Sequence, residues 1–212
     1  MNTTISPAVT ASDADEYRVQ IERVANVAVR LHIDVSDGIL TPNKLIDVDQ
    51  VWWPGGVRAD LHVMYKRPFD HLDLMIDLQP QMIIVHAEAE GDFLDFAKKV
   101  HKHGIEVGVA LQPDTPVKTI KPALEYIDHV LIFSGKLGYF GGKADLHLLE
   151  KVTELRALKP QLEIGWDGGV NAENARALAE GGIDVLNSGG YVQKAESAAK
   201  AYDELCAAVA KS

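Results

Sequence analysis

The chain has 212 residues, 47% of them hydrophobic and 25% charged, a composition typical of one soluble globular domain. Its formal net charge of -10 argues against nucleic acid or an anionic membrane as partner, whereas a local phosphate pocket stays compatible with an acidic body. Cys206 is the only cysteine, so we expect no intramolecular disulfide. The N-terminus lacks the basic residues and apolar run of a signal peptide, and no apolar stretch is long enough to span a bilayer. We therefore expect a cytoplasmic protein.

Eight short runs rich in β-branched residues alternate with stretches that carry apolar residues at helical spacing. The predicted strands cover residues 3–8, 29–35, 59–64, 82–86, 105–111, 129–134, 162–166 and 185–188. Helix signals fall between them: Ser12 precedes an acidic first turn, and Gly104 follows a last turn rich in Lys and His. This alternation predicts an α/β fold with a parallel sheet, closed as a (β/α)8 TIM barrel in one domain over residues 1–212. An open, doubly wound sheet is the alternative.

The second predicted strand carries a histidine and an aspartate two residues apart. Side chains alternate between the two faces of a strand, so His32 and Asp34 share one face, while Leu31, Ile33 and Val35 share the other. The apolar set is expected to pack against the surrounding helices, which leaves His32 and Asp34 pointing into the barrel at the carboxyl end of the strand, where barrel active sites lie. A hydrogen-bonded structural pair is the simpler reading of one such motif.

The third and seventh predicted strands add further polar side chains at the same end of the barrel. Asp60, His62 and Met64 share one face of the third strand, and Asp167 lies directly before Gly168-Gly169. The set of two imidazoles and two carboxylates is His32, Asp34, His62 and Asp167. These donors suit a divalent cation such as Zn²⁺, Fe²⁺, Mn²⁺ or Co²⁺, which could polarise a carbonyl group. Two carboxylates could then remove a proton from one face of a carbon and return it to the other.

Glycine pairs follow the last two predicted strands. In barrels these loops commonly hold a phosphate group through backbone N–H groups, so Gly168-Gly169 and Gly189-Gly190 are candidate phosphate contacts. Tight turns are the simpler explanation of such pairs. Gly141 and Gly142 end a third glycine-rich loop, 135–142, which could close over a bound substrate or form an exposed turn.

In the order of these motifs, the chain resembles the ribulose-phosphate 3-epimerase family over nearly its whole length. The segments that carry the resemblance are Ile5-Ser6-Pro7-Ala8-Val9, His32-Ile33-Asp34-Val35-Ser36-Asp37-Gly38, Asp60-Leu61-His62-Val63-Met64, Val85-His86-Ala87-Glu88, Gly141-Gly142, Asp167-Gly168-Gly169 and Ser188-Gly189-Gly190. A colinear series of this kind is far more specific than any single motif. The resemblance implies a ribulose-phosphate binding barrel.

The resemblance also implies roles for individual residues. One divalent metal ion would be held by His32, Asp34, His62 and Asp167, and the two aspartates would be the acid/base pair. Met64 would line the space near the reacting carbon. The implied reaction is epimerisation at carbon 3 of D-ribulose 5-phosphate to D-xylulose 5-phosphate through an enediolate, by a protein that self-associates into a homo-oligomer.

Several positions depart from the family's pattern and leave the substrate open. Ala8, Ser36 and Phe133 replace residues usual near the reacting centre, while Gly165 replaces a usual Glu and Gly190 a common Ser. The alternatives are the same chemistry on another ketose phosphate, such as a hexulose 6-phosphate, and a non-catalytic sugar-phosphate binder. A lysine-centred decarboxylase or aldolase is a weaker alternative, because no Asp-x-Lys pair follows a predicted strand.

Overall fold

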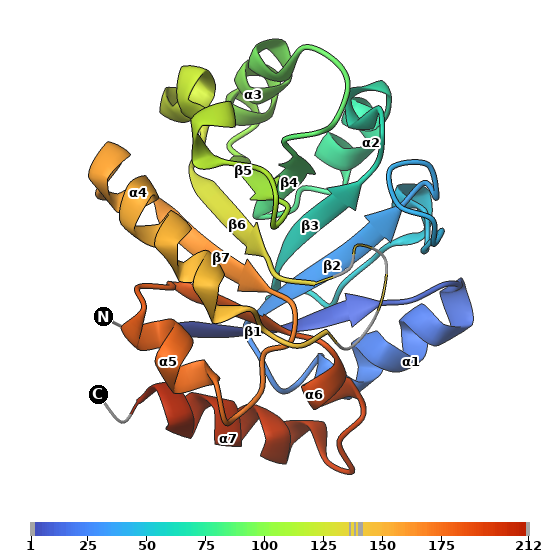
Figure 1. Ribbon diagram of the computed structural model, residues 1–212. Helices are drawn as coiled ribbons and strands as arrows, with labels where there is room; N and C mark the ends of the chain where they lie inside the picture. The colour runs from blue at the N-terminus through green and yellow to red at the C-terminus, as the bar shows by residue number, and fades with distance from the viewer. Residues whose placement is uncertain (1–2, 136, 138, 140–141, 211–212) are drawn as a thin grey trace.

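The strands of the computed structural model, which describes residues 3–135, 137, 139 and 142–210, form a closed parallel barrel in the order β1 to β8 (Figure 1). Their bounds are β1 Thr4–Thr10, β2 Arg30–Ser36, β3 Arg58–Met64, β4 Met82–His86, β5 Glu106–Leu111, β6 His129–Phe133, β7 Glu163–Asp167 and β8 Val185–Ser188. All eight predicted strands are present, and closure through the β1–β8 pair excludes the open sheet. The barrel prediction is confirmed.

Helices cover the outside of the barrel (Figure 1). They are α1 Ala14–Val24, α2 Leu72–Asp77, α3 Phe93–Lys102, α4 Glu150–Leu158, α5 Ala175–Glu180, α6 Gly190–Gln193 and α7 Ala198–Val209. The connections after β2 and β5 contain short 3₁₀ turns instead, at Val48–Gln50, Val117–Thr119 and Lys121–Tyr126. No described helix has the length and apolar character needed to cross a membrane.

One of the two helix signals read from the sequence needs adjustment. The N-cap of α1 is Asp13, whose carboxylate accepts a hydrogen bond from the Glu16 N–H, and not the preceding Ser12. Ser12 instead donates its hydroxyl and its N–H to the Glu16 carboxylate. The end of α3 is as predicted, because Gly104 has a φ of 73°, a left-handed conformation that glycine adopts without strain.

Alternation along the strands separates two buried regions. Leu31, Ile33 and Val35 belong to the apolar core between the barrel and its helices, and all three are fully buried. His32 and Asp34, on the opposite face of β2, project into the barrel interior. The register places Asp34 beside His62 on β3, so both side chains reach the same level of the barrel.

Inside the barrel, polar groups lie at both ends and apolar ones between them. The amino ends of the strands carry a buried network in which Arg30 donates to Asp60 at 2.7 Å and to both oxygens of Glu163 at 2.8 Å. An apolar cluster of Met82, Ile84, Ala110 and Leu131 fills the middle. This layering leaves the carboxyl ends of the strands for the site.

Candidate active site

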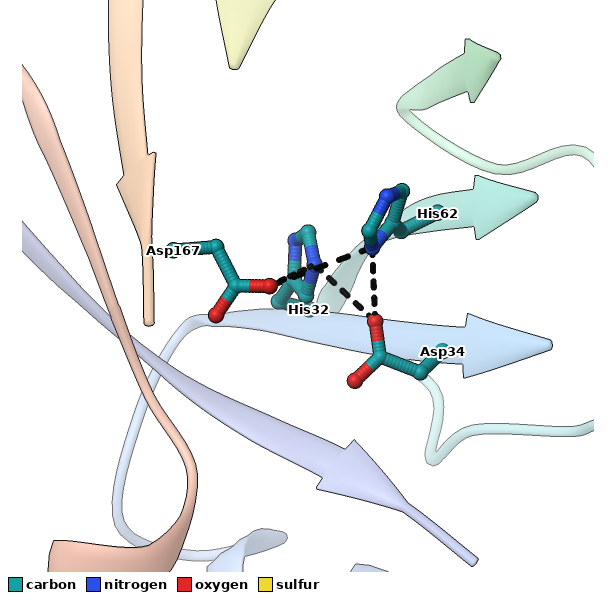
Figure 2. Close-up of side chains that lie close together, drawn as sticks. All are labelled: His32, Asp34, His62 and Asp167. Atoms are coloured by element: carbon teal, nitrogen blue, oxygen red, sulfur yellow. Dashed lines mark hydrogen bonds and ion pairs between the residues drawn. The ribbon is translucent and has the colours of Figure 1, made fainter. Parts of the chain in front are cut away.

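Four side chains from β2, β3 and β7 converge at the carboxyl end of the barrel (Figure 2). The Asp34 Oδ1 atom lies 2.8 Å from His62 Nδ1 and 3.3 Å from His32 Nε2. The Asp167 Oδ2 atom lies 3.9 Å from each of the same two nitrogens. One donor atom from each residue falls within 4.8 Å of the others. The structure therefore brings together the four residues selected from the sequence.

The environment of these donors fits a cation. The His32 and His62 side chains are fully buried, whereas Asp34 and Asp167 keep 8% and 14% of their side-chain surface exposed. Both ring nitrogens of His32 lack a hydrogen-bond partner, and buried polar atoms seldom remain in that state. A metal ion at the centre of the four donors would give the Nε2 atom of His32 a partner. Imidazole nitrogens with carboxylate oxygens suit the borderline divalent ions.

The two carboxylates have unlike protonation properties. Burial alone would raise the pKa of Asp34, but the neighbouring His32 and His62 rings outweigh it and hold that pKa below its usual range. For Asp167, burial and then repulsion by the Asp34 carboxylate raise the pKa. Carboxyl groups whose surroundings push their pKa values apart are the arrangement that acid and base roles require.

A cavity of about 280 Å³ opens directly above the carboxylates. Its walls include both aspartates and most of the residues predicted to contact substrate, namely Met64, Gly142, Gly168, Gly169, Gly189 and Gly190. Gly141 lies outside the described residues. Lys194 also lines the cavity, at the residue that follows α6, and adds a positive charge to its wall. The volume is near the lower end of the roughly 300–1,000 Å³ of small-molecule sites, which suits a small substrate.

The Gly168-Gly169 pair is required by the backbone itself. Gly168 has a φ of 112°, and a Cβ atom there would lie 2.1 Å from the Ser134 carbonyl oxygen. Gly169 has a φ of 72°, and its Cβ would lie 2.3 Å from the Ala144 backbone nitrogen. The loop after β7 thus passes too close to the loop after β6 for any side chain. This crowding explains the glycines whether or not their N–H groups also bind an anion.

Thr10 is a site residue that the sequence analysis missed. The predicted first strand ends at residue 8, but β1 continues to Thr10, which pairs in register with Asp34. The Thr10 hydroxyl donates a 2.5 Å hydrogen bond to the Asp34 Oδ2 atom, and Thr10 lines the cavity. The available signal was the alternation of Ser6, Ala8 and Thr10 on one face of the strand.

His86, the last residue of β4, and Glu88, which follows two residues later, form a polar layer behind His62, in which His86 is buried and Glu88 is partly buried. The Nε2 atoms of His62 and His86 are 2.8 Å apart, and His86 Nδ1 lies 3.4 Å from Glu88 Oε2. Glu88 also accepts a short hydrogen bond from the Thr115 hydroxyl. Burial lowers the pKa of His86 to about 4. Burial would raise the pKa of Glu88, but the neighbouring His86 ring and the hydrogen bond from Thr115 lower it to about 2.

The departures from the family pattern have distinct surroundings. Ala8 and Phe133 both line the cavity, and the Phe133 ring packs against the rings of His62 and His86 at centroid distances of 6.1 and 6.3 Å. Ser36 is fully buried and donates its hydroxyl to the Asn43 carbonyl oxygen, so this polar group serves the loop after β2.

Gly165 has a different explanation. A Cβ atom at this position would lie 2.5 Å from His129 Nε2, so the histidine ring takes the space that a side chain on residue 165 would need. The His129 ring is in turn held by a 2.7 Å contact between its Nδ1 atom and Glu163. This substitution therefore belongs to the polar network at the amino end of the barrel and not to the cavity.

Known proteins resemble the chain in both sequence and fold. The model of the Ribulose-phosphate 3 epimerase family matches residues 4–193. A ribulose-phosphate 3-epimerase of Helicobacter pylori is 34% identical over 200 residues, which cover 91% of each chain. The Bacillus subtilis protein of that name is 29% identical over 211 residues, with 95% of this chain and 97% of that protein covered. The solved structure of KGPDC from Streptococcus mutans superposes with a TM-score of 0.76 over 100% of this chain and 99% of the other, at 12% identity, a likeness of fold alone. On the family match and these sequence relatives, the chain belongs to the ribulose-phosphate 3-epimerase family.

Proposed function

We propose that this protein, acting as one domain over residues 1–212, is a metal-dependent isomerase that converts D-ribulose 5-phosphate to D-xylulose 5-phosphate by epimerisation at carbon 3. The observation that carries the proposal is the pair Asp34 and Asp167, two carboxylates with opposite pKa shifts in the wall of one cavity. The family relationship supports the same reaction.

In the proposed reaction, one carboxylate removes the carbon 3 proton from one face of the substrate. The other carboxylate delivers a proton to the opposite face of the resulting enediolate, and the direction of the reaction decides which of the two begins. Asp34 stands on β2 and Asp167 on β7, with β1 and β8 between them in the barrel, so they approach the substrate from separate positions. Thr10 orients the Asp34 carboxylate through its Oδ2 atom.

One divalent metal ion, Zn²⁺, Fe²⁺, Mn²⁺ or Co²⁺, would be held by His32, Asp34, His62 and Asp167. When bound, such an ion polarises the substrate carbonyl and stabilises the negative charge that follows loss of the proton. Met64 and Phe133 supply apolar walls to the same cavity and limit the access of water to the reacting carbon.

The substrate phosphate is proposed to lie at the glycine loops after β7 and β8. Gly168, Gly169, Gly189 and Gly190 line the cavity without side chains, so an anion can approach their backbone N–H groups closely. Lys194 brings a complementary positive charge to this part of an otherwise acidic protein.

The two alternatives have weaker support. Phe133 takes up space in the cavity wall and the Ser36 hydroxyl is engaged by the Asn43 carbonyl, so neither departure offers new room or a free polar group to the additional carbon of a hexulose 6-phosphate. A non-catalytic binder has no need for two carboxylates placed at the reacting centre. Kinetic comparison of five- and six-carbon ketose phosphates separates the first alternative from our proposal.

We also propose that the protein forms a homo-oligomer in the cytoplasm, with a phosphorylated ketose as its partner and neither nucleic acid nor membrane. The free, half-buried thiol of Cys206 is compatible with a reducing compartment. Exposed apolar side chains such as Ile39 and Trp52, at 70% and 44% exposure, offer surface for self-association. Light scattering on the purified protein tests the oligomeric state.

The acid/base assignment is tested by turnover of D-ribulose 5-phosphate in D₂O. The product should acquire one deuterium at carbon 3, because the proton that is removed and the proton that is returned belong to different carboxylates. Asp34→Asn and Asp167→Asn should each lower turnover by about 100- to 10,000-fold. Asp15→Asn, at a side chain that is 96% exposed, is the matched control and should behave as the unaltered protein. Near-normal turnover by Asp34→Asn would refute the assignment.

A further inference from the structure

The polar chain behind His62 offers an inference beyond the reaction itself, and it rests on the metal-binding role proposed above. The chain runs from His62 through His86 and Glu88 to Thr115, over strands β3 and β4 and the loop that follows β5. The His86 residue is 2% exposed, and its ring lies 5.0 Å from that of His62, between centroids. Phe133 covers the His86 ring edge-on.

A hydrogen bond between two facing imidazole nitrogens requires a proton on one of them and a lone pair on the other. If His62 offers the lone pair of Nδ1 to a cation, its own proton stands on Nε2 and is donated to His86 Nε2, 2.8 Å away. His86 then accepts with Nε2 and, as a neutral ring, carries its proton on Nδ1. That nitrogen lies 3.4 Å from the Glu88 Oε2 atom, within reach of an electrostatic contact although neither atom has a hydrogen-bond partner in the structure, and an ionised carboxylate can only accept.

The opposite order of donors leaves no lone pair on His62 Nδ1 for a cation. Without a cation, a proton on this nitrogen can be donated to Asp34 Oδ1, 2.8 Å away, so that proton and the cation compete for the same nitrogen. With its proton on Nδ1, a neutral His62 would donate to Asp34 and accept from His86 Nε2–H. The lone pair of His86 Nδ1 would then point at the Glu88 carboxylate, an unfavourable contact between two acceptors inside a buried region. Thr115 holds Glu88 in this position by donating its hydroxyl to the carboxylate.

We propose that His86, Glu88 and Thr115 are positioning residues that hold His62 in the tautomer with a free Nδ1 lone pair aimed at the metal centre. Outer partners of metal-bound histidines usually act through a single hydrogen bond to a carboxylate or carbonyl. Here a second imidazole extends that connection, and the carboxylate acts on the ligand from one ring further away.

The first test measures Zn²⁺ affinity of the metal-stripped protein by competition with a chelator, so that turnover is not needed. Glu88→Leu and His86→Leu should weaken Zn²⁺ binding by about 10- to 100-fold. Glu88→Gln and His86→Gln, whose amide oxygens can still accept the hydrogen bond, should recover most of the affinity. Glu90→Gln changes an exposed carboxylate two residues away and is the matched control. Thr115→Val, which removes only the donor to Glu88, should give a smaller loss in the same direction and reports on the chain if His86→Leu fails to fold.

The second test reads the tautomers directly from imidazole ¹⁵N chemical shifts in the Zn²⁺-loaded protein. We expect the proton of His62 on Nε2 and that of His86 on Nδ1. A His86 ring protonated on Nε2, or unchanged Zn²⁺ affinity in the folded Glu88→Leu and His86→Leu proteins, would overturn the inference. Expected tautomers in a protein that does not turn over ribulose 5-phosphate would refute the proposed reaction and leave the positioning role standing.

Discussion

Arg30 should contribute far more to the stability of the barrel than a surface arginine does. Its guanidinium donates to Asp60 at 2.7 Å and to Glu163 at 2.8 Å, and the exposed fractions of the Arg30, Asp60 and Glu163 side chains are 6%, 2% and 35%. In Arg30→Met, the Asp60 carboxylate stays buried without its cation, while Glu163 can regain water. Removing one partner of a buried ion pair costs about 3–5 kcal/mol.

This loss in the free energy of unfolding lowers the melting temperature. A change of 1 kcal/mol shifts the Tm of a chain of this size by about 2–4 °C, so Arg30→Met should melt roughly 6–20 °C lower. Calorimetry or circular dichroism measures the shift, and turnover well below the melting range should be retained because the network lies at the amino end of the strands. Arg18→Met, at a side chain that is 56% exposed, is the control and should change the free energy of unfolding by less than about 0.5 kcal/mol.

Adding Asp60→Asn to Arg30→Met tests whether the loss of stability arises from the unpaired Asp60 carboxylate. If the cost arises from an unpaired buried charge, the double variant with Arg30→Met should regain part of the lost Tm, because the neutral amide is less costly to bury. An Arg30→Met protein that melts within about 2 °C of the unaltered one would refute the argument, since that shift corresponds to at most about 1 kcal/mol.

Three further outcomes follow from the geometry. Thr10→Val removes the hydrogen bond to Asp34 and should lower kcat/KM by roughly 10- to 150-fold, the equivalent of about 1.5–3 kcal/mol. Thr10→Ser keeps the hydroxyl and should retain most activity. Equal kinetics for the two variants would contradict the orienting role. Gly168→Ala places a Cβ atom 2.1 Å from the Ser134 carbonyl oxygen, so a thermal melt should show a loss of at least about 1–3 kcal/mol, and an unchanged melt would be inconsistent with the crowding. Burial would raise the pKa of Glu163, but hydrogen bonds from Arg30 and His129 hold it well below its ordinary value of 4.5, so this stabilisation is present above pH 4.5 and is lost as the pH falls below it. Acid titration of stability should therefore be shallower for Glu163→Gln, and an identical slope would argue against the linkage.

The features that the sequence predicts well are those with a local cause. Runs of β-branched residues located all eight strands, and the alternation in β2 placed His32 and Asp34 inward because Leu31, Ile33 and Val35 must pack outward. The same alternation applied to β3 selected His62, and the position of Asp167 directly before a glycine pair at the end of β7 completed the set that converges in the barrel.

The features that the sequence did not predict depend on register and closure. Thr10 contacts Asp34 only because β1 runs two residues past the predicted end and pairs with β2. Arg30 meets Glu163 across 133 positions of the chain, which no local pattern reports. The contact of His86 with His62 is not visible in the sequence, since it depends on the geometry of two neighbouring inward rings.

The central claim is a metal-dependent epimerase centred on His32, Asp34, His62 and Asp167. It is tested most directly by an assay of D-ribulose 5-phosphate epimerisation on metal-stripped protein, with and without added Zn²⁺, Mn²⁺ or Fe²⁺. We predict that D-xylulose 5-phosphate formation is lost on stripping and restored by at least one of these ions. Folded protein that shows no turnover with any of them would contradict the account.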